Sequence, residues 1–329
     1  MLPTQTPTFL ASDFNVASAY ERAEAFAASL RTQILAKEVP AIDPTLSILC
    51  ADQSSSEILA LDPYADWADP GSVRLRWAPL TAPEIPKAHR AWFENPSECK
   101  PLPDQRHALV TALNGGVALV DLHTQQAILH AFVGGNPHSA EHLPDGSIAC
   151  ACSTSNTIAI FPGCPTHQNT PHPEIFSTGL KDAHGIVWDD NRKILWAIGL
   201  ESLIGSTYNF NTHAPQLQRH IEIDCPAFAR HGHDLIAVPD TDFLLLTGVG
   251  VALFDREHHV FVLVTDTRNL KSISLYGTDE NCALIIQKPT THWWSDQICF
   301  LNRELTPVGK RPGARFYKGR WWKHPTCGI

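Results

Sequence analysis

Residues 95–104 read NPSECKPLPD, and residues 136–145 read NPHSAEHLPD. Each stretch runs seven positions from a starting residue, Ser97 or His138, to an aspartate. Four more segments repeat this spacing and end on Asp or Asn: residues 36–43, 184–191, 233–240 and 272–279. Short β-type runs follow each of these turns. A repeat of roughly 40–50 residues that is rich in short strands is typical of a β-propeller. Six copies therefore predict an all-β fold, a six-bladed β-propeller.

The two ends of the chain complete this prediction. Apolar residues at three- and four-residue spacing predict a helix over residues 15–37 that packs on the outside or bottom of the propeller. Its apolar stripe is Tyr20, Ala23, Ala27, Leu30 and Ile34. Residues 1–35 then form an N-terminal segment and residues 36–329 the propeller. The inner strand of blade one is expected at 36–43, although Pro40 lies within it, and residues 314–321 are expected to form the fourth strand of blade six.

Composition excludes several classes of function. The 329 residues carry a net charge of −9, which disfavours a general nucleic-acid binder. There is no run of about 20 apolar residues and no secretion signal, so we expect no membrane partner and a cytoplasmic location. The nine cysteines include no CxxC pair, and buried free thiols are expected. Nucleotide-binding glycine motifs and a serine-nucleophile elbow are also absent.

Three histidines occupy the equivalent starting position in consecutive repeats: His138, His184 and His233. Because inner strands surround the axis of a propeller, these side chains are expected to meet at one mouth of the channel. Neutral imidazoles can bind a divalent metal or transfer protons. A third interpretation is structural, with each histidine bonding to the backbone of the next blade. Ser97, Ser272 and Ala36 take the starting position in the other repeats, which predicts a lopsided site.

Two further sets of side chains are candidates for substrate binding. His142, Trp188 and Tyr276 each stand four residues after the starting position of their repeat, and we expect them along the channel wall. A loop of blade six carries Gln287, Trp293 and Trp294. Adjacent tryptophans in a loop favour ligand contact, because exposing them without covering anything is unfavourable.

Four strings carry a resemblance to known proteins: residues 136–141 (NPHSAE), 183–189 (AHGIVWD), 232–235 (GHDL) and 293–296 (WWSD). They resemble a family of six-bladed propellers from fungi and bacteria, over about residues 45–322. Fungal hetero-Diels–Alderases of tropolone–sesquiterpenoid biosynthesis also look like six-bladed propellers. The strings are similar as well to propeller lyases in which inner-strand histidines hold a divalent metal. No catalytic carboxylate matches between those lyases and this chain.

The leading hypothesis is a redox-neutral lyase or cyclase, of the hetero-Diels–Alderase type, without a cofactor. It acts on an apolar, hydroxylated natural product in secondary metabolite biosynthesis, with His138, His184 and His233 as catalytic residues. His142, Trp188, Tyr276, Gln287, Trp293, Trp294, Ser97 and Ser272 are expected to bind this small-molecule substrate. One alternative is a metal-dependent lyase or hydrolase of a polar substrate such as an acidic sugar, with the three histidines as metal ligands. Another is a non-enzymatic interaction scaffold.

Overall fold

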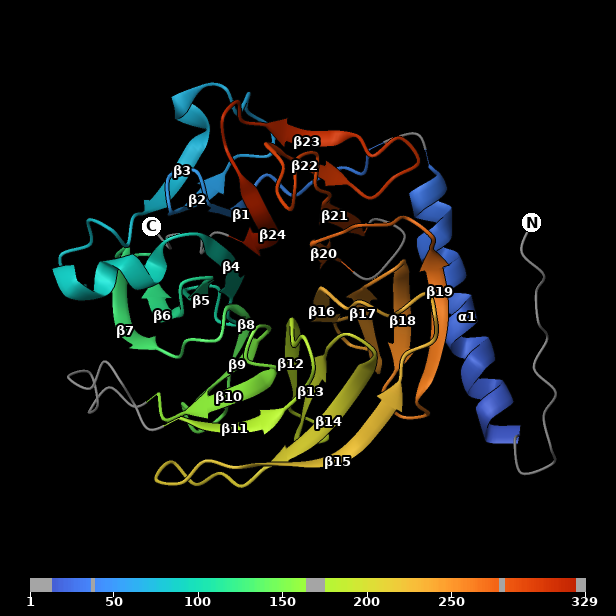
Figure 1. The fold of residues 1–329 in the computed structure, drawn as a ribbon. Helices are drawn as coiled ribbons and strands as arrows, with labels where there is room; N and C mark the ends of the chain where they lie inside the picture. Colours follow the sequence, from blue (N-terminus) through green and yellow to red (C-terminus); the bar gives the residue numbers. More distant parts are fainter. Residues whose placement is uncertain (1–13, 37–38, 164–174, 278–281, 324–329) are drawn as a thin grey trace.

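The computed structural model describes residues 14–36, 39–163, 175–277 and 282–323. Six four-stranded antiparallel sheets stand around one axis, so the predicted six-bladed propeller is confirmed (Figure 1). In every blade one strand lies innermost, beside the axis. The innermost strands are β24, β4, β8, β12, β16 and β20.

Blades two to six are each built from four consecutive strands, the innermost first. Blade two has β4 (Pro96–Pro101), β5 (His107–Ala112), β6 (Gly116–Asp121) and β7 (Gln126–Phe132). Blade three has β8 (Pro137–His142), β9 (Ile148–Cys152), β10 (Thr157–Phe161) and β11 (Phe176–Gly179). Blade four has β12 (Gly185–Asp189), β13 (Ile194–Ile198), β14 (Ser202–Tyr208) and β15 (Leu217–Asp224). Blade five has β16 (Asp234–Ala237), β17 (Phe243–Thr247), β18 (Val251–Asp255) and β19 (Val260–Thr265). Blade six has β20 (Ser272–Tyr276), β21 (Ala283–Gln287), β22 (Gln297–Phe300) and β23 (Pro307–Lys310).

Blade one joins the two ends of the chain. Its outer strands are β1 (Leu46–Asp52), β2 (Glu57–Leu61) and β3 (Val73–Trp77), and its inner strand is the last strand, β24 (Phe316–Lys323). The predicted inner strand at 36–43 and the assignment of 314–321 to blade six are therefore wrong. Pro40 has no N–H to donate to a central ladder, whereas β24 pairs with β1 along its length.

The closing strand also ties blade one to both neighbours. The indole Nε1 of Trp321 donates to the Ala283 carbonyl of blade six at 3.0 Å. The indole of Trp322 donates to the Gln105 carbonyl of blade two at 2.7 Å. Both tryptophans are buried, and they lie between blades on either side of β24 and not within blade six.

The helix α1 (Phe14–Leu35) lies along the outside of blade five, beside β19 (Figure 1). Ala23, Ala27, Leu30 and Ile34 are buried in one apolar cluster with side chains of blades five and six. Tyr20, which the predicted stripe included, is 39% exposed, since it lies near the edge of the contact. The stripe is otherwise confirmed.

The insertion between β2 and blade two lies on the outside of the propeller. It contains β3 and two 3₁₀ helices, η1 (Pro70–Ser72) and η2 (Lys87–Phe93). Phe93 and Trp77 are buried in one apolar cluster with residues of β5 and β6. The insertion therefore covers the outer edges of blades one and two.

Three of the repeated aspartates form turns, as the sequence predicted. A carboxylate oxygen of Asp43, Asp104 and Asp145 accepts a hydrogen bond from the backbone N–H two residues later in each case. Such Asx turns reverse the chain without further support. In blades two and three the seven-position spacing therefore measures the distance from the start of the inner strand to the turn that follows it, whereas in blade four the acceptor in the turn is the carboxylate of Asp189.

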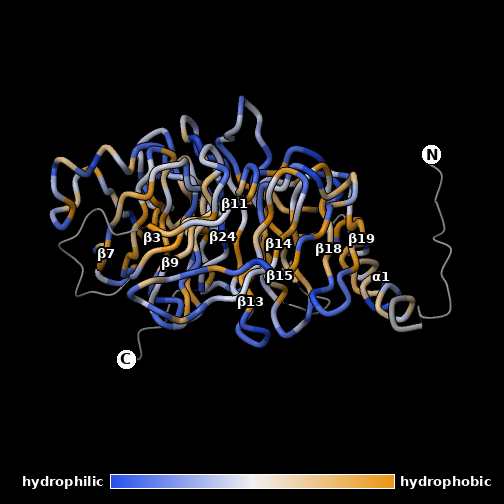
Figure 2. Tube along the Cα trace, turned by 60° about the horizontal axis from the view of Figure 1, so that its bottom comes forward, coloured by the Kyte–Doolittle hydropathy of each residue, from blue (hydrophilic) through white to orange (hydrophobic). Residues whose placement is uncertain are grey.

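Apolar residues lie within the strands, and the loops at both ends of the axis are mostly hydrophilic (Figure 2). The seven described cysteines are free and buried, which confirms the prediction for them; Cys164 and Cys327 lie outside the described residues. In the described part of the chain, no helix has the length and apolar character needed to span a membrane.

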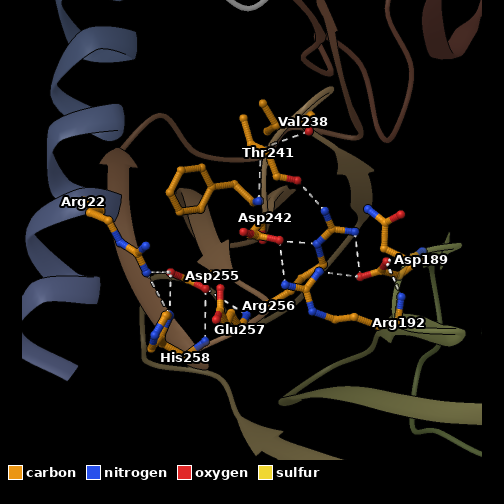
Figure 3. A network of polar contacts seen from close by, with 12 residues as sticks. Arg22, Asp189, Arg192, Val238, Thr241, Asp242, Asp255, Arg256, Glu257 and His258 are labelled. Carbon is orange, nitrogen blue, oxygen red and sulfur yellow. Dashed lines mark hydrogen bonds and ion pairs between the residues drawn. The ribbon is translucent and has the colours of Figure 1, made fainter. Parts of the chain in front are cut away.

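A polar network joins blades four and five at the end of the axis where β12 stops (Figure 3). The buried carboxylate of Asp189 contacts Arg192 at 3.2 Å and Arg256 at 2.8 Å. Arg192 reaches on to Asp242 at 2.6 Å. Next to it, Arg22 of α1 bonds His258 at 3.1 Å, so the helix is held by polar contacts as well as by its apolar face.

Candidate functional site at one mouth of the axis

The three predicted histidines meet at the end of the axis where the inner strands begin. His138 is the second residue of β8, and His184 and His233 immediately precede β12 and β16. The rings of His138 and His184 are stacked with centroids 4.1 Å apart, and those of His184 and His233 meet edge-on at 4.8 Å. We call this group, together with Asp182, Lys271 and Tyr317, the histidine mouth.

Asp182 determines the tautomer of His184. The Nδ1–H of His184 donates to the backbone carbonyl of Asp182 at 2.9 Å, and the Asp182 carboxylate lies 3.5 Å from the same nitrogen. With the proton on Nδ1, Nε2 keeps its lone pair and is a base. Burial lowers the pKa of His184, and the contact with Asp182 offsets only part of this shift. The ring is therefore neutral near pH 7.

Lys271 is the partner of His233. Its ammonium Nζ lies 3.0 Å from Nε2 of His233 and donates to it, so the ring proton of His233 is on Nδ1. Burial, followed by repulsion from Lys271, lowers the pKa of His233 to about 2. Burial likewise lowers the pKa of Lys271 below its usual value. Both groups therefore favour their neutral forms more than exposed counterparts do.

His138 lies between His184 and Tyr317, whose ring centroid is 5.4 Å from that of His138. Burial, and then repulsion from His184 and Lys318, lowers the pKa of His138 far below its usual value. Tyr317 is itself buried, and burial raises the pKa of its phenol, which keeps it protonated. The mouth thus combines three neutral imidazoles, one phenol, one ammonium and the carboxylate of Asp182.

A buried charge cluster fills the axis next to the histidine mouth. Arg320 of β24 forms two hydrogen bonds with Asp234 of β16, both 2.6 Å long, and also binds Glu98 of β4. Lys318 lies 3.1 Å from Asp234 and 3.6 Å from Glu98. Burial alone would raise the pKa of each carboxylate, but the two cations lower it. The cluster links blades one, two and five across the axis.

Three other predicted residues lie at the same end of the axis, and each makes buried contacts between strands or blades. The Ser97 hydroxyl donates to the Pro137 carbonyl at 2.6 Å, next to His138. The hydroxyl of Ser272 accepts from the Gly319 N–H at 3.1 Å. The amide Nε2 of Gln287 donates to the Phe316 carbonyl at 2.9 Å. These contacts hold the inner strands that carry the mouth.

The two tryptophans of the blade-six loop also belong to this end of the molecule, because the loop follows the end of β21 that pairs with Ser272. Trp293 is 48% exposed, and its indole donates to the Gln53 side chain at 3.0 Å. The guanidinium of Arg315 lies 5.3 Å from the ring centre of Trp294. An exposed, hydrogen-bonded indole on the face of the mouth is available to contact a ligand.

His142, Trp188 and Tyr276 lie towards the opposite end of the axis. They stand four residues further along inner strands, which corresponds to about 13 Å. Trp188 packs edge-on against Phe210, and the Tyr276 hydroxyl donates to Asp43 at 3.1 Å. The structure does not bring these three together with the histidines, since the buried charge cluster lies between the two levels.

Sequence reasoning missed Lys271, Asp182 and Tyr317. Lys271 directly precedes Ser272, the first residue of its repeat, and Asp182 stands two residues before His184, so both were within reach of the repeat alignment. Tyr317 could not be found in that way, because the strand that carries it was assigned to the wrong blade.

The histidine rings do not fit a metal site as they are arranged. In the stretches of chain that the structure describes, no three His, Cys, Asp or Glu side chains are placed to hold a metal ion. Two of the rings are stacked face to face, so their nitrogen lone pairs do not converge, and the ammonium of Lys271 occupies Nε2 of the third. A cation at this point would also meet the charges of Lys271 and Lys318.

Comparison with solved structures gives only distant likenesses. Dihydro-heme d1 dehydrogenase NirN, in complex with DHE, aligns at 14% identity and a TM-score of 0.47, over 93% of this chain and 61% of that one. Hydrazine synthase of Kuenenia stuttgartiensis aligns at 14% identity and a TM-score of 0.45, over 63% of this chain and 61% of that one. The chain thus spans about three fifths of the length of these proteins, and likenesses this weak carry no functional argument.

Comparison with curated proteins gives no match. A family of unknown function, DUF6528, matches residues 33–328, which include all 24 strands of the propeller and the whole histidine mouth. This match covers most of the chain. The chain therefore belongs to the DUF6528 family.

Proposed function

We propose that this protein is a redox-neutral enzyme of the lyase or cyclase type that uses the histidine mouth for acid–base catalysis on a small molecule. The observation that carries the proposal is the set of neutral imidazoles in contact with one another and with the half-buried ammonium of Lys271. Such a set contains both a proton acceptor and a proton donor within one site.

The two roles fall to different side chains. Nε2 of His184 is unprotonated, since the other ring nitrogen donates to Asp182, so this atom is the general base. Because the pKa values of the imidazoles are lowered, their protonated form is scarce at neutral pH, so they are not the proton donor. The ammonium of Lys271 is the better donor to a leaving hydroxyl. This assignment gives the role of acid to a lysine, and not to one of the three histidines that the sequence predicted as catalytic.

Unpartnered polar atoms favour a polar group of the substrate at the mouth. Nδ1 of His138, Nδ1 of His233 and Oε1 of Gln287 are buried, and none has a hydrogen-bond partner among the described residues. Buried polar atoms in folded proteins nearly always have partners. A hydroxyl or carbonyl group of the substrate can form hydrogen bonds with these atoms, and so can a water molecule that the substrate displaces. A hydrocarbon cannot.

The hetero-Diels–Alderase type of reaction is one version of this proposal. Loss of a hydroxyl group would generate a reactive diene at the mouth, and the apolar partner would pack under Trp293 on the same face. Holding the two partners together accelerates such a reaction by orientation. Trp188 and Tyr276 have no part in this version, because they lie at the other level of the axis.

The test is a turnover screen with hydroxylated small molecules, followed by mass spectrometry for loss of water or for isomerisation without a change of mass. For any substrate found, His184→Ala and Lys271→Met should each lower kcat by about 100-fold or more, the scale of one general acid or base. His123→Ala, which alters an exposed histidine on the outer side of blade two, is the matched control. Unchanged rates in folded His184 and Lys271 variants would remove the mouth from the mechanism.

A further inference from the structure

Lys271 differs from the other lysines beside the axis in its partner. Lys318 is fully buried and ion-paired with two carboxylates, and Lys100 lies 3.2 Å from the carboxylate of Glu141. The nearest partner of Lys271 is instead the neutral imidazole of His233, 3.0 Å away. A carboxylate at ion-pair distance stabilises the ammonium form of its partner more than a neutral imidazole does.

The position of Lys271 makes its amine both desolvated and reachable. Its backbone N–H donates to the Gln287 carbonyl just before β20, which fixes its Cα at the mouth. The side chain is only half-buried, unlike that of Lys318. An amine that is partly desolvated and lies beside a second cation is the usual setting of a nucleophilic lysine.

The two charged groups that face Lys271 act on its pKa in opposite directions, and burial determines the direction of the shift. Burial lowers its pKa most, Lys318 on β24 lowers it further, and Asp182 before β12 opposes this. His233 and the two other histidines of the mouth are neutral, so they do not add positive charge. A part of the Lys271 population is therefore free amine at a lower pH than for exposed lysines.

We propose that Lys271 is a nucleophile that forms an imine with a carbonyl group, so that the substrates of the histidine mouth are carbonyl compounds. This inference deepens the proposed function and rests on it for the catalytic use of the imine. The ammonium first loses a proton to water, and the amine, which can still donate a hydrogen bond to Nε2 of His233, attacks the carbonyl carbon. The carbonyl oxygen takes up two of the three ammonium protons, one of them by way of water, and leaves as water. The protonated imine keeps the third, so no oxidant or reductant is needed.

The test is reductive trapping of the full chain at pH 7 with pyruvate or propionaldehyde and sodium cyanoborohydride, followed by peptide mass spectrometry. Lys193 and Lys310 are the internal controls, since their side chains are 54% and 60% exposed and each is near a carboxylate. Accessibility alone would favour modification of these two. We expect Lys271 to be alkylated at least about fivefold faster than either of them, because its amine is activated.

Two variants make the test specific. Lys271→Arg should lose the fast adduct. His233→Gln keeps a hydrogen-bond acceptor beside Lys271, so fast trapping at Lys271 should remain, and trapping at Lys193 should be unchanged. Trapping at Lys271 no faster than at Lys193 would overturn the imine. If trapping at Lys271 were slow but His184→Ala still abolished turnover, the imine would be wrong and the acid–base function would stand. If trapping at Lys271 were fast but His184→Ala left turnover unchanged, the acid–base function would be wrong.

Discussion

The side chains around the histidines, and not the histidines alone, determine their chemistry. The repeat in the sequence placed His138, His184 and His233 in equivalent positions, but it says nothing of their protonation. Asp182 fixes the tautomer of His184, and Lys271 fixes that of His233. The charged neighbours Lys318 and Lys271 add to the effect of burial on all three pKa values.

The buried charge cluster predicts a large effect of one substitution. Asp234→Asn removes a carboxylate that faces both Lys318 and Arg320, and these two cations then share Glu98 alone. Breaking a buried ion pair from one side typically costs about 3–5 kcal/mol, because a charge is left uncompensated. Urea unfolding of the purified variant measures this change.

The matched control is Asp190→Asn, in which the carboxylate is 71% exposed and pairs with Lys193 on the surface. It should change the free energy of unfolding by no more than about 0.5 kcal/mol. Equal effects of the two substitutions would show that the buried charge cluster contributes no more to stability than a surface ion pair does.

At the scale of elements, the helix α1 is attached to blade five through one narrow apolar face. Ala27 is fully buried against this blade, and the adjacent Ala28 is exposed. Ala27→Glu should place a charge in an apolar contact and destabilise the docked helix by about 2–4 kcal/mol. Ala28→Glu is the matched control, because it makes the same substitution on the solvent-exposed side of the helix.

Hydrogen exchange of α1, together with thermal unfolding, distinguishes the two variants. Faster exchange along α1 is expected in Ala27→Glu and wild-type exchange in Ala28→Glu. Protection of α1 that is unaltered in Ala27→Glu would contradict the packing described for this face.

The closure of blade one marks the limit of what the sequence predicts at this scale. Each of the other five blades follows a local rule, in which the innermost strand comes first in its repeat and the three outer strands follow it. Blade one breaks this rule because its inner strand comes from the far end of the chain, and no local pattern encodes that pairing. Because of this error, Tyr317, Lys318 and Arg320 were assigned to the wrong blade, and the buried charge cluster was not predicted.

At the scale of the whole molecule, the number of blades and the meeting of the histidines could be predicted. How far the site extends along the axis could not. Strand periodicity correctly predicted that positions four residues apart lie on the same face of an inner strand. It could not tell that Glu98, Asp234, Lys318 and Arg320 fill the space between the two levels. Burial of charge depends on partners from several blades, which one sequence does not reveal.

The buried neutral histidines predict how stability depends on pH. A base whose pKa is lower in the folded state gains a proton on unfolding, so its contribution is full above the unfolded pKa of about 6.5 and falls below it. For His233 this window extends down to about pH 2. Between pH 6 and 5 the free energy of unfolding should therefore decrease. In His233→Gln it should decrease less steeply, with a slope that is smaller by about 1 kcal/mol per pH unit.

His123→Gln is the control for this slope, because His123 is exposed. Urea unfolding at pH 6.0, 5.5 and 5.0 gives the three slopes. A His233→Gln slope equal to that of the unaltered protein would mean that His233 is not held neutral by the fold.

The central claim is that the mouth holds three neutral imidazoles, with the base of His184 on Nε2. Nitrogen NMR of the histidine side chains at pH 7 tests it most directly, with assignments from the single His→Ala variants. We predict neutral rings for His138, His184 and His233 at pH 7, protonated on Nδ1 in His184 and His233, and no titration of His233 down to about pH 5, since its pKa is about 2. Imidazolium signals at pH 7, or titration of these rings near their ordinary pKa of about 6.5, would contradict the claim.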